Sequence, residues 1–231
     1  MPLKVWSKFS VKKGGNVINL RIVDMPNNLY EKVTNLYMNY YVKEDPIFKA
    51  SGLLKSAAAL EELREMMQKF TKGDGLHSAI CCIDNGDDQV NDPIAASMMA
   101  LTNKGDPEPK FELKTEEIKK MFEIYYGMEA QFSEQKAVNL DRYYSDRGTF
   151  LNSEYKDLGI LQELLKVRRL ICKEQGIPKH GTWMTSQDLQ SAAEADGWET
   201  AYEIKFEDLG KQYGVAFDKE PASAKFMIVK I

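Results

Sequence analysis

The stretch GTFLNSEYKDLGILQELL, residues 148–165, contains an apolar extended segment, a polar turn and the start of a long amphipathic helix. One glycine, Gly159, lies in the first turn of that helix, where glycine costs about 1 kcal/mol relative to alanine. The first N–H groups of a helix have no partner within the helix and carry a partial positive charge, so they bind anions such as phosphate. A glycine there removes the Cβ that would keep a phosphate away from the backbone. The order strand, turn, glycine, helix therefore makes this stretch a candidate phosphate-binding site.

An ordinary helix entrance is the alternative explanation of the same residues. In that interpretation Asp157 is the N-cap, and Gly159 is needed only for close packing of the chain. The stretch contains neither GxxxxGK[ST] nor GxGxxG after a strand, so neither of these nucleotide-binding motifs decides the question. On the local sequence alone, the ordinary entrance is favoured.

The chain alternates segments with strand and helix patterns, separated by glycine, proline and acidic turns. Alternating or β-branched segments predict strands at residues 18–23, 77–84, 93–103, 142–152, 181–185, 198–209 and 225–231. Helical spacing of apolar residues predicts helices at residues 27–42, 56–70, 113–132, 158–176 and 186–196, with caps at Ser56 and Thr115 and a stop near Gly73. Residues 43–52 are expected to form a loop. No composition shift marks a linker, so we expect one α/β domain over residues 1–231 with a central mixed sheet.

Composition is that of an ordinary soluble protein and argues against several classes of partner. The 231 residues are 43% hydrophobic and 29% charged. The formal net charge of -4 argues against nucleic acid and anionic membrane surfaces as partners, and no apolar run reaches the roughly 18 residues that a membrane helix needs. The basic N-terminal segment has no apolar segment behind it and is therefore not a secretory signal. The three cysteines and two distant histidines suggest reduced core cysteines and no metal, so we expect a cytoplasmic protein, and a monomer.

Four segments of the sequence, taken together and in order, form a specific pattern, although each segment by itself is a weak signal. Residues 43–52 read KEDPIFKASG, residues 147–151 read RGTFL, residues 155–161 read YKDLGIL and residues 184–209 read MTSQDLQSAAEADGWETAYEIKFEDL. The pattern resembles the acetyl-CoA-dependent N-acetyltransferase superfamily (the GNAT fold), and more narrowly the arylalkylamine N-acetyltransferase-like proteins of insects. In that family the corresponding segments are DEPLN, RGLSV, a loop of the form R/Q-x-x-G-x-G/A, and FTxxFSQxAAEKxGFExxYEVxYEDL. The resemblance covers nearly the whole chain and implies a mostly antiparallel sheet of about seven strands flanked by helices.

The resemblance also implies a co-substrate, a reaction and a set of binding residues. Acetyl-CoA would donate the acetyl group, and a primary amine, an arylalkylamine, would accept it by direct attack on the thioester. In this sequence the strand residues that would pair with the pantetheine arm are Thr149, Phe150 and Leu151. The loop residues that would hold the pyrophosphate through backbone N–H groups are Lys156, Asp157, Leu158, Gly159, Ile160 and Leu161.

This chemistry requires a base, because a primary amine is mostly ammonium at pH 7 and is then no nucleophile. Asp45 falls on the family's base position, and Glu44 beside it is a second candidate. The alternative for both is a solvated acidic loop before Pro46. Thr185 and Ser186 are candidates to protonate the leaving thiolate, although Ser186 equally fits a helix cap.

Besides Asp45, which stands where the family has glutamate, and Thr185, which stands where it has serine, four residues depart from the family pattern. Leu189 replaces a serine and cannot donate a proton, while Lys156 replaces an arginine and loses its planar fork. Leu161 replaces glycine or alanine and adds bulk near the phosphates. Asp157 replaces a common glycine and adds a negative charge, or caps the same N–H groups. The alternative function is therefore an altered family member that binds CoA or a small ligand without efficient transfer.

Four tyrosines have two interpretations. Tyr125, Tyr126, Tyr143 and Tyr144 would suit the pocket of an aromatic amine, through stacking or cation–π contacts. Their helix and strand spacing favours the other interpretation, which is that they belong to the core.

Overall fold

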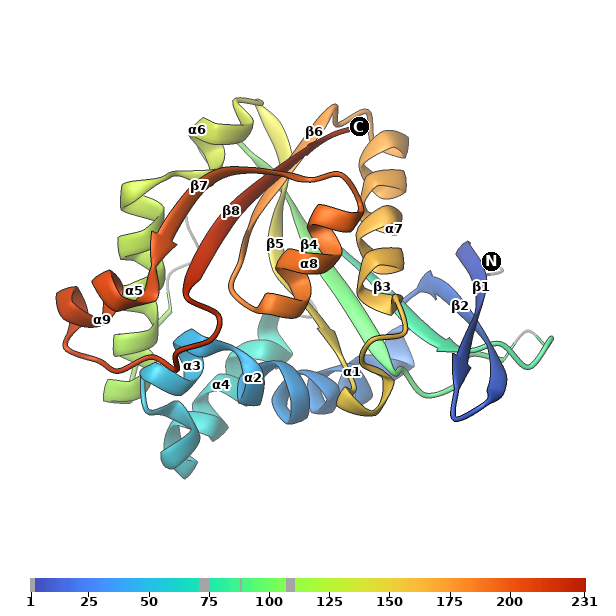
Figure 1. The fold of residues 1–231 in the computed structure, drawn as a ribbon, viewed down its shortest axis with the longest axis horizontal. Helices are drawn as coiled ribbons and strands as arrows, with labels where there is room; N and C mark the ends of the chain where they lie inside the picture. The colour runs from blue at the N-terminus through green and yellow to red at the C-terminus, as the bar shows by residue number, and fades with distance from the viewer. Residues whose placement is uncertain (1–2, 71–74, 88, 107–110) are drawn as a thin grey trace.

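Eight strands form two antiparallel sheets in the computed structural model, which describes residues 3–70, 75–87, 89–106 and 111–231 (Figure 1). The strands are β1 (Val5–Lys13), β2 (Asn16–Asp24), β3 (Leu76–Ile83), β4 (Ala95–Asn103), β5 (Arg142–Leu151), β6 (Lys179–Met184), β7 (Glu199–Lys205) and β8 (Ser223–Lys230). The five-stranded sheet has the order β1-β2-β3-β4-β5, and the three-stranded sheet has the order β6-β8-β7. The sequence predicted all of these strands except β1, an edge strand in which Val11 is the only buried residue of nine. Such an exposed edge lacks the apolar pattern on which the prediction depends.

Helices cover both faces of the sheets. They are η1 (Asn27–Leu29), α1 (Tyr30–Leu36), η2 (Tyr37–Tyr41), α2 (Val42–Glu44), α3 (Pro46–Ala50), η3 (Leu53–Lys55), α4 (Ala57–Phe70), α5 (Glu116–Gln131), α6 (Glu134–Val138), η4 (Ser153–Tyr155), α7 (Ile160–Glu174), α8 (Gln187–Ala195) and α9 (Phe206–Tyr213). Helices α5 and α7 lie on opposite sides of the sheets (Figure 1). None of the helices in the described ranges has the length and apolar character needed to cross a membrane.

Side chains of the central strands alternate between two cores, as strand geometry requires. In β3, Ile80 packs with the helices α1–α5, whereas Ala79 and Cys81 pack with α7. Helix α7 also contacts both sheets, because Leu164 belongs to the core under the five-stranded sheet and Leu165 to a third core beside α8. The loop before α7 is thus held next to the junction of the two sheets.

The helix expected at residues 27–42 is present and contains a π-helical turn, η2, at Tyr37–Tyr41. Such turns are rare and occur frequently at functional sites. The rings of Tyr37 and Tyr41 have their centroids 5.0 Å apart, and both rings pack against Phe150 of β5. The wide turn therefore brings two tyrosines of one helix to the same strand.

Three segments differ from the prediction. Residues 43–52 are not a loop, because Asp45 caps the short helix α3 and Pro46 occupies its first turn. Strand β7 ends at Lys205, and residues 206–209 begin α9, whose acidic first turn suits a helix N-terminus. Helix α6 was not predicted. The cap at Ser56 is confirmed, since its Oγ accepts a hydrogen bond from the N–H of Ala59 at 3.2 Å, and Gly73 lies outside the described residues.

The junction of the two sheets lies between β5 and β6. Within the described residues β5 pairs only with β4, and β6 pairs only with β8. The register between β4 and β5 shifts beside Gly148, whose φ of +111° is open to glycine but strained for other residues. Residues 149–151 therefore lie on a free edge of β5.

A buried arginine occupies the interior of this junction. Arg168 of α7 is 1% exposed and donates to Ser97 Oγ at 2.6 Å. It also donates to the carbonyl oxygens of Met98 and Gly148, at 3.2 and 3.3 Å, and forms an ion pair of 2.5 Å with Asp146. The two carbonyl oxygens belong to residues at the register shift between β4 and β5, where the ladder of backbone hydrogen bonds is irregular. Arg168 therefore supplies hydrogen-bond donors to carbonyl groups at this place. Arg168 was not among the residues predicted from the sequence.

Candidate active site

Asp45 is a buried carboxylate at the start of α3. Its Oδ1 accepts hydrogen bonds from the N–H groups of Ile47 at 2.8 Å and Phe48 at 3.3 Å. Its Oδ2 accepts the hydroxyl hydrogen of Thr185 at 2.5 Å, from the end of β6. The residue is only 2% exposed, so it does not belong to a solvated acidic loop.

Two opposing effects act on the pKa of Asp45. Burial raises the pKa, while the hydrogen bonds from Thr185, Ile47 and Phe48 lower it, and the net result is a pKa above the usual range. A carboxylate of raised pKa is a better proton acceptor than one of ordinary pKa. Environments of this kind are typical of catalytic bases.

Thr185 and Ser186 are already hydrogen-bonded within the protein. The hydroxyl hydrogen of Thr185 points to Asp45, and Ser186 Oγ caps α8 by accepting from the N–H of Leu189 at 3.3 Å. Ser186 still lines the pocket described next and retains its own hydroxyl hydrogen. The geometry therefore makes Thr185 a positioning residue for Asp45 and confirms the cap at Ser186.

A pocket lies where α2, β5, the loop before α7 and α8 meet. It is lined by Tyr40, Tyr41, Glu44, Asp45, Thr149, Phe150, Leu151, Lys156, Leu161, Ser186, Asp188 and Leu189. The structure thus brings together most of the residues that the sequence singled out, from segments up to about 140 positions apart. Asp157, Leu158 and Gly159 belong to the loop before α7 and do not line this pocket, and Thr185 lies behind it against Asp45. Ile160 is 1% exposed and belongs to the core.

The backbone conformation at the helix entrance is the feature that favours glycine at position 159. Its φ is +75°, and a Cβ built there would meet no atom within 4 Å, so close packing does not require the glycine. Gly159, not Asp157, is the N-cap of α7, and no side chain of the described residues hydrogen-bonds to the cap. Asp157 itself has a φ of +60°. The interpretation as an ordinary helix entrance is therefore wrong on both points, because Asp157 does not cap α7 and close packing does not require Gly159.

Lys156 and Glu44 form an ion pair at the mouth of the pocket. Lys156 Nζ lies 3.0 Å from Glu44 and 3.3 Å from Asp188. Partial burial lowers the pKa of Lys156, but the two carboxylates outweigh it and raise the pKa above its usual value. Unlike Asp45, Glu44 is partly exposed and its charge is compensated by Lys156.

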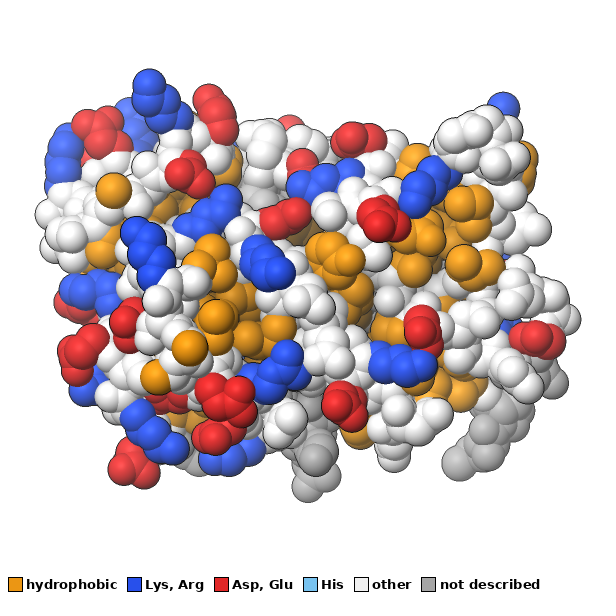
Figure 2. Space-filling view, turned by 90° about the horizontal axis from the view of Figure 1, so that it is seen from below, with side chains coloured by type: hydrophobic (Ala, Val, Ile, Leu, Met, Phe, Trp, Pro, Cys, Tyr) orange, Lys and Arg blue, Asp and Glu red, His pale blue; other side chains and the backbone are white. Residues whose placement is uncertain are grey.

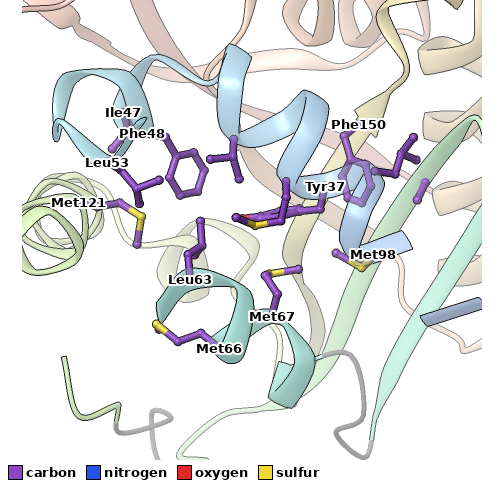
Figure 3. Close-up of a cluster of buried hydrophobic side chains, with 14 of the residues drawn as sticks. Tyr37, Ile47, Phe48, Leu53, Leu63, Met66, Met67, Met98, Met121 and Phe150 are labelled. Carbon is purple, nitrogen blue, oxygen red and sulfur yellow. The ribbon is translucent and has the colours of Figure 1, made fainter. Parts of the chain in front are cut away.

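An apolar cavity of about 290 Å³ adjoins this pocket and shares Tyr41 with it. Figure 3 shows part of its lining, in which Tyr37, Phe48, Leu63, Met66, Met67, Met98 and Met121 lie close together. Tyr125 also lines this cavity, together with Asp146, Arg147 and Gly148 of β5. Burial, and then the charge of Asp45, raise the pKa of Tyr41 and of Tyr125 well above its usual value, so both tyrosines stay protonated.

The other three tyrosines do not reach this cavity. Tyr143 and Tyr144 are buried, Tyr144 within the core beneath α7, and Tyr126 is half exposed. The core interpretation is confirmed for Tyr144, while Tyr125 fits the pocket interpretation.

On the face seen in Figure 2, hydrophobic side chains gather in two areas among charges of both signs.

Comparison with known proteins gives the fold an independent test. No family model matches the sequence, and no curated protein sequence matches it either. Among solved structures, a protein of the mosquito Aedes aegypti assigned as arylalkylamine N-acetyltransferase 7 matches with a TM-score of 0.82 at 19% identity, over 99% of this chain and 95% of that one. Arylalkylamine N-acetyltransferase 2 of the same mosquito matches with a TM-score of 0.75 at 18% identity, over 92% and 99% of the two chains. A polyamine N-acetyltransferase of Drosophila melanogaster matches with a TM-score of 0.68 at 10% identity, over 92% and 100%. The chain therefore has the fold of the GNAT superfamily of N-acetyltransferases, which the sequence pattern had predicted.

Proposed function

We propose that this protein transfers the acetyl group of acetyl-CoA to a primary amine, and that the amine is an arylalkylamine. The observation that carries the proposal is the position of Asp45, a buried carboxylate of raised pKa in a pocket between the free edge of β5 and the start of α7. The similar solved structures bear the names of arylalkylamine and polyamine N-acetyltransferases, which supports the same reaction.

Acetyl-CoA would bind across the junction of the two sheets. Its pantetheine arm would lie along the free edge of β5, where Thr149, Phe150 and Leu151 line the pocket. The pyrophosphate would bind to the N–H groups of Leu158, Gly159, Ile160 and Leu161, because no side chain of the described residues occupies the cap position of α7. The positive φ of Gly159 gives this turn its shape.

The reaction would begin with removal of a proton from the bound ammonium group. Asp45 would accept that proton directly or through a water molecule. The neutral nitrogen would then attack the thioester carbonyl carbon, forming a C–N bond and a tetrahedral intermediate. The intermediate would collapse with cleavage of the C–S bond. The excess proton on the nitrogen would pass to the departing thiolate, which leaves as the free thiol, and Asp45 would release its own proton to solvent.

The apolar cavity would hold the aromatic part of the acceptor. Its rings and thioethers suit an aryl group, and Tyr41 lines both this cavity and the pocket that contains Asp45. An amine with its ring in the cavity would thus direct its nitrogen past Tyr41 toward Asp45. We further propose that the protein is a cytoplasmic monomer.

A second function is favoured by two specific residues. Leu189 lines the pocket at a position where a hydroxyl would serve as proton donor, and Leu161 narrows the pocket beside the helix entrance. A protein that binds CoA or a small ligand without efficient transfer is the alternative. Calorimetric titration with acetyl-CoA, followed by a thiol-release assay over a panel of amines, separates the two. Binding with turnover of an arylalkylamine supports the enzyme, binding without turnover of any amine supports the alternative, and absence of binding contradicts both.

Gly159→Val is expected to weaken acetyl-CoA binding at least tenfold, about 1.4 kcal/mol, because the added side chain stands where the pyrophosphate approaches. The positive φ also makes the substitution cost about 1–2 kcal/mol of stability, which lowers the melting temperature by several degrees. Gly176→Val is the matched control, since Gly176 has a φ of +69°, ends the same helix and has no atom within 4 Å of a built Cβ. Calorimetry should show weaker binding in the Gly159 variant alone, and equal affinities in the two variants would contradict the pyrophosphate site.

Thr185→Val is expected to move the acidic limb of the kcat–pH profile to higher pH. The Thr185 hydrogen bond lowers the pKa of Asp45, so its removal raises that pKa and the base is protonated over a wider range. The shift should be about one pH unit, since a hydrogen bond to a charged group contributes roughly 1.5 kcal/mol or more and one unit corresponds to about 1.4 kcal/mol. Thr185→Ser should restore the parent profile, and a limb that stays in place in the valine variant would show that Thr185 does not act on the base.

A further inference from the structure

Three segments far apart in the sequence meet at the mouth of the pocket through one side chain. Lys156, in the loop before α7, forms ion pairs with Glu44 at 3.0 Å and with Asp188 at 3.3 Å. Glu44 ends α2 and directly precedes Asp45, and Asp188 lies in the first turn of α8. A single ammonium group therefore joins the segment that carries the base to the loop that faces the proposed pyrophosphate site.

These ion pairs are accessible to solvent and hence to a ligand. The three side chains are 39% to 46% exposed, and exposed ion pairs of this kind contribute little to stability. The ion pairs therefore restrain the loop only weakly. An anion that reaches the mouth of the pocket can therefore replace either carboxylate at the ammonium group.

The charges that line the pocket favour competition of this kind. Among its described lining residues, Glu44, Asp45 and Asp188 are acidic and Lys156 is the sole base. A diphosphate brings about two further negative charges to this place. Among the described residues that line the pocket, only the ammonium group of Lys156 can compensate these charges, and both carboxylates already share it.

We propose that Lys156 is an electrostatic latch, closed by Glu44 and Asp188 in the empty pocket and opened when the diphosphate of the co-substrate competes for its ammonium group. The inference rests on the proposed function, because it requires CoA to bind at the start of α7. In this arrangement Glu44 and Asp188 weaken cofactor binding through Lys156. Opening also frees the end of α2, next to Asp45, from its tie to the loop.

A double-mutant cycle with calorimetric titration of coenzyme A tests the latch. Glu44→Gln and Asp188→Asn are each expected to tighten CoA binding about threefold, and the two together about tenfold. Lys156→Met should weaken binding about tenfold, since it removes the compensating charge. In the Lys156→Met background the two acid substitutions should leave the affinity unchanged, because the latch that they release is already gone.

Glu154→Gln is the matched control for loss of a nearby negative charge. Glu154 lies in the turn just before Lys156, is 72% exposed and pairs with Lys13 at 3.9 Å instead, so its substitution should leave the affinity unchanged. Tightening by the acid substitutions that persists in the Lys156→Met background would indicate general repulsion and overturn the latch. Binding by the parent protein with no tightening in the single variants would also overturn the latch but leave the cofactor site intact. Absence of CoA binding by the parent protein would overturn the proposed site and the latch together.

Discussion

Asp45→Asn is expected to lower the rate of amine acetylation at pH 7 by about 10²- to 10⁴-fold, the range that a positioned general base contributes. Asparagine keeps the capping oxygen for α3, so the melting temperature should change little. The loss of rate should be largest at pH values above the pKa of Asp45 and below the pKa of the amine. In that range the acceptor is an ammonium group and depends on the base. The rates of variant and parent should approach each other as the pH nears the pKa of the amine. Initial rates of thiol release over pH 5 to 10 measure this profile.

Two comparisons make the result specific to the base. Asp196→Asn changes another buried aspartate, which accepts from Trp198 Nε1 at 3.0 Å outside the pocket, and should keep the shape of the parent profile. Glu44→Gln should also keep the acidic limb, whereas the double amide should lose it. If both single amides and the double amide keep the parent profile, then neither carboxylate is the base.

Arg168→Met is expected to destabilise the protein by about 3–5 kcal/mol, the usual cost of removing one partner of a buried ion pair. The substitution leaves the carbonyls of Met98 and Gly148 and the hydroxyl of Ser97 without their donor, and Asp146 without its cation. In a chain of this length such a loss lowers the melting temperature by roughly 6–20 °C. Urea unfolding at equilibrium measures the free energy directly.

Lys166→Met is the natural comparison, because Lys166 lies on the same helix, its side chain is 48% exposed, and it pairs with Glu163 at 3.0 Å. It should cost about 1 kcal/mol or less, as an ion pair on a helix surface does. Arg168→Lys should fall between the two, since lysine keeps the charge but cannot make the same set of directed bonds. A free energy of unfolding for Arg168→Met within 1 kcal/mol of the parent would show that Arg168 does not hold the junction.

Strands and helices with a regular apolar period were predictable because burial on one face produces that period. Helix α7 is of this kind, whereas β3 and β4 are buried on both faces and were recognised as short continuous apolar runs. The GNAT fold was predicted from the resemblance of four sequence segments to that family. Strand β1 and the short helices α3, α6 and α9 were not predicted, since exposed edges and helices of one or two turns leave little periodic pattern. Side-chain caps mark the starts of α3 and α6, at Asp45 and Ser133, whereas α9 has no such cap among the described residues.

The candidate site could be predicted where it follows from local backbone rules, and less well where it depends on contacts between distant segments. Gly159 was predictable as a helix-entrance residue, but its positive φ and the absence of an Asp157 cap emerged only from the structure. The hydrogen bond between Thr185 and Asp45 joins residues 140 positions apart and has no local signature. Arg168 did leave a signal, because it falls on the apolar stripe of α7 together with Leu164, Leu165, Ile171 and Cys172. A charged residue on such a stripe indicates a buried partner.

In the described part of the chain, strands β5 and β6 are not joined by a ladder of backbone hydrogen bonds, so the molecule is least stiff in the direction that separates the two sheets. Within the described residues, the strands of each sheet are tied to their neighbours by rows of backbone hydrogen bonds, but the two sheets are joined by side-chain packing, including the contact of Arg168 with His180 of β6 at 3.5 Å. A small change in their separation therefore compresses or stretches side-chain contacts and breaks no backbone row. Across every other strand boundary the same displacement would cost a series of hydrogen bonds. The compliance of the fold is thus concentrated at the place where a ligand of the proposed kind would have to enter and leave.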